Sequence, residues 1–182
     1  MNSKKIFALL LLVITTISCK DEAKKDDNGQ QNQEVATPDN TFKVSLNVVV
    51  KKNDNFCLLY TEDGSTNFKE GIWKEVKAAE NGQIVEFSLP KDIIPSQLRL
   101  DLGMNKDQEP IVINSFQMNY SNNEFKIPGN QFWIYFNPDL TKTAFDKNTA
   151  TVSGLVKDGV RQSPSFYPNT TPLGNEIRKI IK

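Results

Sequence analysis

From residue 41 onward, apolar and polar residues alternate in a series of short segments. In the segment 42–50, Phe42, Val44, Leu46 and Val48 recur at every second position. Successive side chains of a β-strand point to opposite faces, so this pattern predicts a strand with one buried face. Comparable strand-like segments lie at 55–61, 72–76, 83–90, 97–103, 111–120 and 123–128.

The segment 97–103 shows the alternation most clearly. Its leucines at every second position should point into a core, whereas Arg99 and Asp101 should point outward. Glycine, proline and asparagine separate these strand-like segments at close spacing, which is typical of an antiparallel sandwich or barrel. We therefore expect an all-β fold, an antiparallel β-sandwich that occupies residues 41–182.

Two interruptions of the pattern predict turns or loops. Asn81-Gly82 is the pair typical of a tight hairpin, here between the segments 72–76 and 83–90. The segment 163–172 contains three prolines, which block both ladder and helix hydrogen bonds. We expect a loop there, fastened to the sandwich by its aromatic residues.

Helical periodicity is confined to short segments, at 131–136 and 173–181. In the second of these, Leu173, Ile177, Ile180 and Ile181 fall on one face of a helix. The sandwich should therefore end in a short C-terminal helix.

The first 18 residues follow a different pattern. Lys4 and Lys5 precede a nine-residue apolar run, and small polar residues follow it. This tripartite arrangement is typical of a signal peptide. The run is much shorter than the roughly 20 residues that cross a bilayer as a permanent helix.

Cys19 follows this segment directly. A small residue before the cysteine and charges after it resemble the lipobox of bacterial lipoproteins, although Thr16 stands where an aliphatic residue is commoner. The resemblance implies that residues 1–18 are removed and that the Cys19 thiol carries the lipid that anchors the chain. An ordinary secretory signal with an incidental cysteine is the alternative.

The charged residues after Cys19 suggest a localisation signal. Lys20, Asp21 and Glu22 resemble the surface-export signal of Bacteroidota-type lipoproteins. That resemblance implies an outer-membrane lipoprotein exposed at the cell surface, with the periplasmic face of the membrane as the alternative. From Lys20 to residue 40 the chain has no aromatic residue and one valine. We expect residues 19–40 to form a disordered tether with a reach of about 25 Å.

Composition removes several classes of function. The formal net charge is zero, which gives no electrostatic reason to expect a nucleic-acid partner. The chain has no histidine and only two cysteines, which removes Ser-His-Asp and Cys-His catalysis and the usual zinc sites. Carboxylates, lysine, tyrosine and an oxygen-ligated metal remain.

Three segments form a series: FCLLYT at 56–61, LRLDLG at 98–103 and IVINSF at 111–116. The series resembles galactose-binding-like jelly-roll domains, which occur as carbohydrate-binding modules, and the resemblance covers residues 42–128. It implies a jelly-roll-like sandwich of about nine strands that binds sugar through its loops or one sheet face.

A sugar site combines aromatic rings that stack on a pyranose with carboxylates and amides that bind its hydroxyls. Trp73 is expected to be exposed because it stands beside Lys74 and Glu75, whereas much of the apolar segment 131–136, with Trp133, should be buried. Core packing is the alternative for both tryptophans. The candidate ligand-binding residues are Trp73, Tyr60, Asp101, Asn105, Asp107 and Gln108.

Other chemistry is less well supported by the sequence. Two acidic loops, with Asp54, Asn55, Glu62 and Asp63 and with Asn105, Asp107 and Glu109, could hold a structural calcium ion, but neither fits a 12-residue EF-hand pattern. We expect no cofactor and no metal site. Cys57 stands between apolar residues and should be a small core residue rather than a reactive thiol.

The sequence thus favours a non-catalytic binding module, held at the membrane by a lipid, that recognises glycan or another envelope component. The alternative is a structural or protein-interaction subunit of an envelope assembly. A glycan-active enzyme using the carboxylates of Asp101 and Asp107 is the least favoured hypothesis.

Overall fold

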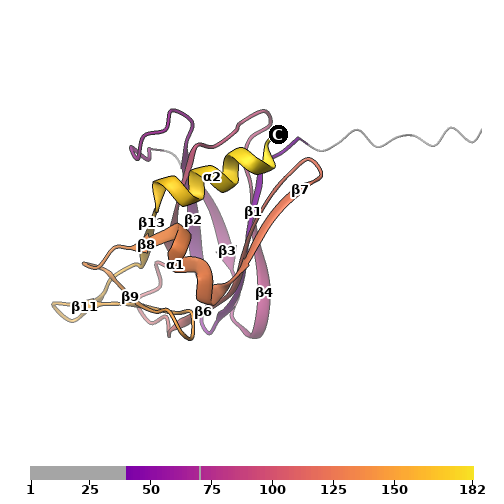
Figure 1. Ribbon diagram of the computed structural model, residues 1–182. Helices are drawn as coiled ribbons and strands as arrows, with labels where there is room; N and C mark the ends of the chain where they lie inside the picture. The colour runs from indigo at the N-terminus through magenta and orange to yellow at the C-terminus, as the bar shows by residue number, and fades with distance from the viewer. Residues whose placement is uncertain (1–39, 70) are drawn as a thin grey trace, which may run out of the picture. The chain divides into compact units, whose positions relative to one another are not determined.

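The computed structural model describes residues 40–69 and 71–182 (Figure 1). The predicted signal peptide, the lipidated Cys19, the export signal and all of the tether except residue 40 lie outside the described residues.

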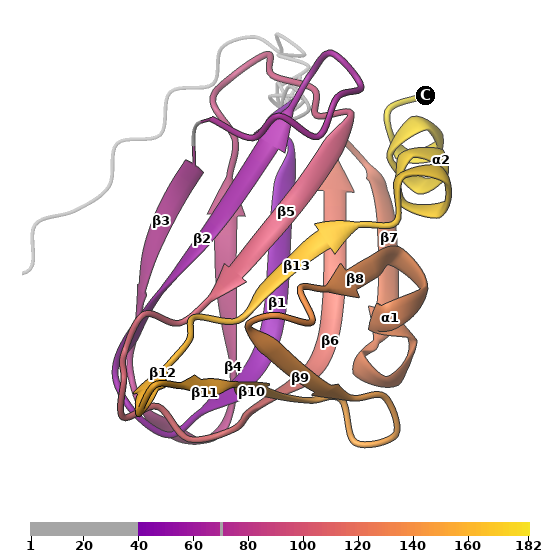
Figure 2. The same ribbon diagram turned by 90° about the vertical axis from the view of Figure 1, so that its left-hand side faces the viewer.

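Two antiparallel sheets pack face to face, and sheet B lies in front of sheet A in Figure 2. Sheet A consists, in order, of β4 (Ala79–Ser88), β1 (Lys43–Val50), β6 (Ile111–Tyr120), β10 (Thr151–Gly154) and β9 (Thr143–Asp146), and β7 (Asn123–Pro128) also pairs with β6. Sheet B consists of β3 (Gly71–Val76), β2 (Asp54–Thr61), β5 (Gln97–Leu102), β13 (Ser165–Pro168) and β8 (Phe136–Pro138). The predicted all-β sandwich is confirmed.

The core lies between the two sheets and follows the alternation in the sequence. Phe42, Val44, Leu46 and Val48 are completely buried, as are the three leucines of β5. Burying a side chain of this size stabilises the fold by roughly 1.5–3 kcal/mol. The buried rings at one side of the core are Phe116, Phe132, Phe136 and Phe166, with centroid separations of 4.6 Å to 5.9 Å between neighbours.

Two helices close one side of the sandwich. A 3₁₀ turn, η1 (Gly129–Gln131), leads into α1 (Phe132–Tyr135), and α2 (Thr170–Ile180) contacts α1, β5, β6 and β7. Leu173, Ile177 and Ile180 are buried, which confirms the predicted apolar face of the C-terminal helix. Trp133 differs from expectation: Phe132 and Phe136 are buried, but Trp133 is 41% exposed.

The predicted hairpin turn at Asn81-Gly82 is wrong, because both residues lie within β4. Chain reversal occurs instead between β3 and β4, where the chain passes from sheet B to sheet A. The β1–β4 register shifts between Val48 and Val50, so the Asn-Gly pair lies in a bulge. A Cβ on Gly82 would lie 2.5 Å from Asn47 Oδ1, an atom at the end of a side chain that can turn away.

The loop predicted at 163–172 is also wrong, because it contains β13 and the first turn of α2. Its prolines stand where no backbone N–H is required. Pro164 precedes the strand and its carbonyl accepts the N–H of Leu102 at 2.8 Å, Pro168 ends the strand, and Pro172 lies in the first helical turn.

Candidate functional site

The outer face of sheet B arises from the alternation in β2. Phe56 and Leu58 point into the core, so Cys57 points outward. Cys57 pairs with Trp73 on β3 and with Asp101 on β5. These three residues therefore form a row across the sheet. Because neighbouring strands lie about 4.8 Å apart, the backbones of Trp73 and Asp101 are separated by about 10 Å.

A second row lies beside the first. Leu59 pairs with Gly71 and with Arg99, and the Arg99 guanidinium lies 4.5 Å from the ring centre of Tyr167 on β13. The segment between β2 and β3 folds back so that the Phe68 ring is 6.4 Å from Tyr167. We call this surface the aromatic face. It consists of Leu59, Phe68, Trp73, Arg99, Asp101 and Tyr167.

Arg99 and Asp101 form the polar centre of the aromatic face. Arg99 Nε donates to Asp101 Oδ1 at 2.9 Å, and Arg99 Nη2 donates to Asp101 Oδ2 at 3.0 Å. Both side chains are largely buried, and this two-point geometry fixes the orientation of both groups. The pair thus presents oriented donors and acceptors beside aromatic surface.

Cys57 forms the floor between Trp73 and Asp101. Burial raises the pKa of its thiol from 9.0 to about 11, the Asp101 charge adds to this increase, and Arg99 opposes it. A Cβ on Gly71 would lie 2.4 Å from Cys57 Sγ, so glycine leaves the space that the sulfur fills. The prediction of a buried thiol is confirmed, but the thiol lies on the outer side of the sheet rather than between the sheets.

Trp73 is 55% exposed, which confirms the expected exposure of this ring. Of the six candidate ligand-binding residues, only Trp73 and Asp101 lie on the aromatic face. The other four lie at the two ends of the sandwich.

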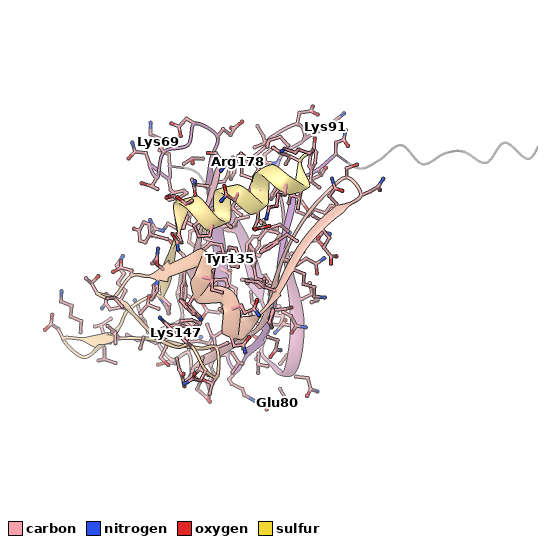
Figure 3. The ribbon with its side chains drawn as sticks, viewed as in Figure 1. Lys69, Glu80, Lys91, Tyr135, Lys147 and Arg178 are labelled. Carbon is pink, nitrogen blue, oxygen red and sulfur yellow. The ribbon has the colours of Figure 1, made fainter. Side chains whose placement is uncertain are left out.

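Tyr60 lies near the end of β2 and packs partly against the core. With Glu62, Asp63, Asn67 and Lys69 it lines an open hollow of about 410 Å³ (Lys69 is labelled in Figure 3). Hydrogen bonds from Ser65 lower the pKa of Asp63, so this carboxylate is charged and already engaged. The hollow is polar and lies apart from Trp73 along the strand.

The opposite end is organised by the buried carboxylate of Asp54. Its Oδ1 accepts the backbone N–H of Asn55, Met104 and Asn105 at 2.8, 2.6 and 2.9 Å. Its Oδ2 accepts Gln108 Nε2 at 2.9 Å. Gln108 is therefore a buried structural residue that holds the loop after β5.

Asn105 and Asp107 belong to the same loop. Asn105 Oδ1 accepts the backbone N–H of Asp107 at 2.9 Å, which is turn-forming geometry. Asp107 is exposed, whereas Asp101 is paired with Arg99 on the aromatic face.

The calcium alternative finds little support in the described part of the chain. Asp54 and Asn55 lie in β2 rather than in a loop, and the Asp54 oxygens already accept N–H donors. Among residues 40–69 and 71–182, no three acidic or thiol side chains gather closely enough to hold a metal ion.

Four members of the aromatic face were not among the sequence candidates: Leu59, Phe68, Arg99 and Tyr167. Tyr167 was missed because a loop was predicted at 163–172, although its position next to Phe166 fits an alternating strand. Arg99 was expected to point outward, but its pairing with Asp101 follows only from the three-dimensional geometry.

No helix among the described residues is long and apolar enough to span a membrane. Comparison with known proteins finds no matching family model, no matching curated protein and no matching solved structure.

Proposed function

We propose that this protein is a non-catalytic glycan-binding module and that the aromatic face is its binding surface. The observation that carries the proposal is the exposed ring of Trp73 in the same row as the oriented Arg99–Asp101 pair. A pyranose has an apolar face that stacks on an indole and hydroxyls that need donors and acceptors. The aromatic face offers both within about two strand spacings.

The ligand that fits the aromatic face best is an extended glycan chain rather than a free monosaccharide. An open sheet face supports successive sugar units, whereas small ligands are usually enclosed by a cleft. Trp73 would stack on one unit, and Tyr167 with its bound Arg99 would contact the next. The jelly-roll resemblance of residues 42–128 supports the same function.

The charged groups of the aromatic face support binding rather than hydrolysis. Both oxygens of Asp101 already accept hydrogen bonds from Arg99, which holds the carboxylate as an acceptor for sugar hydroxyls. A glycosidase needs a second carboxylate across the scissile bond. Asp107, the partner considered in the sequence, lies in the loop after β5.

The proposal includes an outer-membrane lipid anchor at Cys19, with the module exposed at the cell surface. It is supported by the order of basic, apolar and small residues before Cys19 and by Lys20, Asp21 and Glu22 after it. Labelling of cells with a radioactive fatty acid should mark the wild-type chain and not Cys19→Ala. Digestion of intact cells by an added protease distinguishes the surface from the periplasmic face.

A glycan array followed by calorimetry on the best polysaccharide tests the binding function. Trp73→Ala should weaken binding at least about tenfold, which corresponds to about 1.4 kcal/mol. Trp133→Ala is the matched control, because Trp133 is also exposed but lies in α1 with its ring 4.3 Å from Lys147 Nζ. Equal effects of the two substitutions, or no binding to any polysaccharide, would contradict the proposal.

A second candidate function is protein docking within an envelope assembly. It is favoured by a different observation, the exposed aliphatic residues Leu140, Val156 and Val160.

A further inference from the structure

Two segments between β8 and β13 form a projecting arm at one end of the sandwich, where Figure 1 shows β11 standing away from the sheets. The arm consists of the turn 139–142 and the segment 155–161, which contains the hairpin of β11 (Val156–Lys157) and β12 (Val160–Arg161). The Leu155 N–H donates to the Lys142 carbonyl at 2.8 Å, so the turn and the hairpin lie side by side.

Apolar side chains cluster on this arm. Leu140 is 79% exposed and Val156 is 71% exposed, and Leu155 and Val160 are exposed as well. Of the eight large apolar side chains exposed in the described part of the chain, these four belong to the arm. Single exposed apolar residues are ordinary, but four on one projecting part of the chain favour a contact surface. Val156 lies on the hairpin face of its pairing partner Arg161, whereas Val160 lies on the other face with Lys157.

A cationic pocket adjoins the arm. The pocket has a volume of about 320 Å³, and its lining includes Val156 of the arm together with Lys106, Pro110 and Arg161. Lys106 Nζ donates to the Arg161 carbonyl at 3.0 Å, so the two cationic residues are held next to each other.

Arg161 lacks a partner that its position requires. The residue is only 8% exposed, and its Nη1 donates to the Asn105 carbonyl at 3.1 Å. Its Nη2 is buried and has no hydrogen-bond partner among residues 40–69 and 71–182. A buried donor without an acceptor costs about 1–3 kcal/mol, more when it is charged.

Among residues 40–69 and 71–182, the carboxylates near Arg161 do not supply that acceptor. Asp54 is the carboxylate whose charge acts on Arg161, but its oxygens already accept four N–H groups. Asp107 also lines the pocket, and with Lys106 and Arg161 it leaves one net positive charge. The pocket therefore favours a monoanionic acceptor from outside.

We propose that the arm and its pocket bind an acidic segment of a partner protein. An aspartate or glutamate carboxylate binds Lys106 and takes the free hydrogens of Arg161 Nη2 as side chains of the pocket lining move aside. Apolar residues beside it pack on Val156, which lies on the same face of the hairpin as its pairing partner Arg161. Adjacent aliphatic surface and positive charge match an acidic-apolar peptide better than a sugar, which needs aromatic rings. The proposal deepens the second candidate function and stands whether or not the aromatic face binds glycan.

The test is selection of a random peptide library displayed on phage against the full-length protein, followed by calorimetry with synthetic copies of the enriched peptides. The enriched sequences should carry aspartate or glutamate next to large aliphatic residues. Lys106→Ala and Val156→Ser should each weaken binding by about fivefold or more. Both positions are exposed, so both variants should fold.

Matched controls lie on other surfaces. Lys91→Ala removes an exposed lysine far from the arm (Figure 3), and Ile84→Ser removes an exposed aliphatic residue from sheet A. Equal losses in controls and test variants, or enrichment without acidic residues, would overturn the proposal. Acetate, glucuronate and inorganic phosphate are tested as ligands in the same calorimetry. Binding of one of these through Lys106, with no peptide bound, would also overturn protein docking and identify a small-anion site.

Discussion

The two sheets bury their inner faces in the same way but present different outer faces. On sheet A the outward side chains include amides that donate to neighbouring amide or carboxylate oxygens, such as Asn114 to Asn47 at 2.9 Å and Gln117 to Glu124 at 2.9 Å. Ile84 is the exposed large apolar residue of that sheet. On sheet B the corresponding positions carry aromatic rings and a largely buried ion pair.

The difference shows which face is under a constraint beyond solubility. A solvated sheet face needs only polar side chains that satisfy one another or water, and sheet A meets this requirement. Exposing Trp73 and holding Arg99 against Tyr167 gain nothing for solubility, and the glycan ligand that we propose would account for both. Substitutions on the two outer faces should therefore have different effects on stability and on glycan binding.

The largest expected difference concerns stability at high pH. Below pH 9 the Cys57 thiol is protonated in both the folded and the unfolded chain. Between pH 9 and about 11 the unfolded chain loses this proton while the folded chain keeps it, because the pKa of Cys57 is raised to about 11. The free energy of unfolding should therefore fall by up to about 3 kcal/mol through this group.

Urea unfolding of wild type and Cys57→Ala at pH 8, 9.5 and 11 measures that contribution. The difference between the two proteins cancels the titration of lysines and tyrosines elsewhere. Parallel pH curves for the two proteins would show that the thiol is not held neutral under the aromatic face.

The next largest effect on the free energy of unfolding should come from substitution of glycine. An added Cβ at Gly71 would meet the buried Cys57 sulfur at 2.4 Å, and one at Gly82 would meet the ends of the Asn47 and Asn114 side chains. The amides on sheet A can turn away, whereas Cys57 is confined. Gly71→Ala should therefore cost about 2 kcal/mol and Gly82→Ala less than about 1 kcal/mol. Denaturant unfolding of both variants gives the comparison, and a reversed order would contradict it.

A double-mutant cycle on Arg99 and Asp101 should give a moderate coupling free energy. Arg99→Ala, Asp101→Asn and the double variant should show a coupling of about 1 kcal/mol, because the pair is oriented at two points and largely buried. The exposed pair of Lys77 and Glu75 serves as the control and should couple by less than about 0.5 kcal/mol. Thermal or urea unfolding measures both cycles, and equal couplings would remove the argument for a preorganised pair.

The smallest effect should come from sheet A. Gln117→Ala and Asn47→Ala should change the free energy of unfolding by no more than about 0.5 kcal/mol, since both side chains bond only to other surface groups. They should leave glycan affinity unchanged. A loss of affinity on either substitution would transfer the binding function from the aromatic face to sheet A.

The sequence predicted the parts of the fold that are long and regular. β1, β2 and β4 to β7 have six or more residues, and in β1 and β5 above all the alternation of the sequence matches the alternation of burial. β8 to β12 have only two to four residues each, too few for a period to show. β8 and β9 are held instead by their neighbours and by ring contacts of Phe136 and Phe145 with Phe132 and Phe166, whereas in the described part of the chain β11 and β12 pair only with each other.

The candidate site was predicted in part for the same reason. Trp73 and Asp101 stood in regular segments, so their outward direction followed from local pattern. The burial of Gln108 could not be read from the sequence, because its partner Asp54 lies 54 residues away and no local signal marks that hydrogen bond. Tyr167 required knowledge that β13 lies beside β5.

The position of β13 also bears on how the chain reaches its folded state. It is the last strand along the sequence, yet it lies between β5 and β8 inside sheet B. Until residues 165–168 are available, β5 and β8 have no common neighbour and Phe132 lacks the ring of Phe166 against which it packs. Contacts of such long sequence separation form slowly. A chain that completes sheet B with β13 keeps that sheet open until late in synthesis, a property that would suit the export through a membrane that we propose.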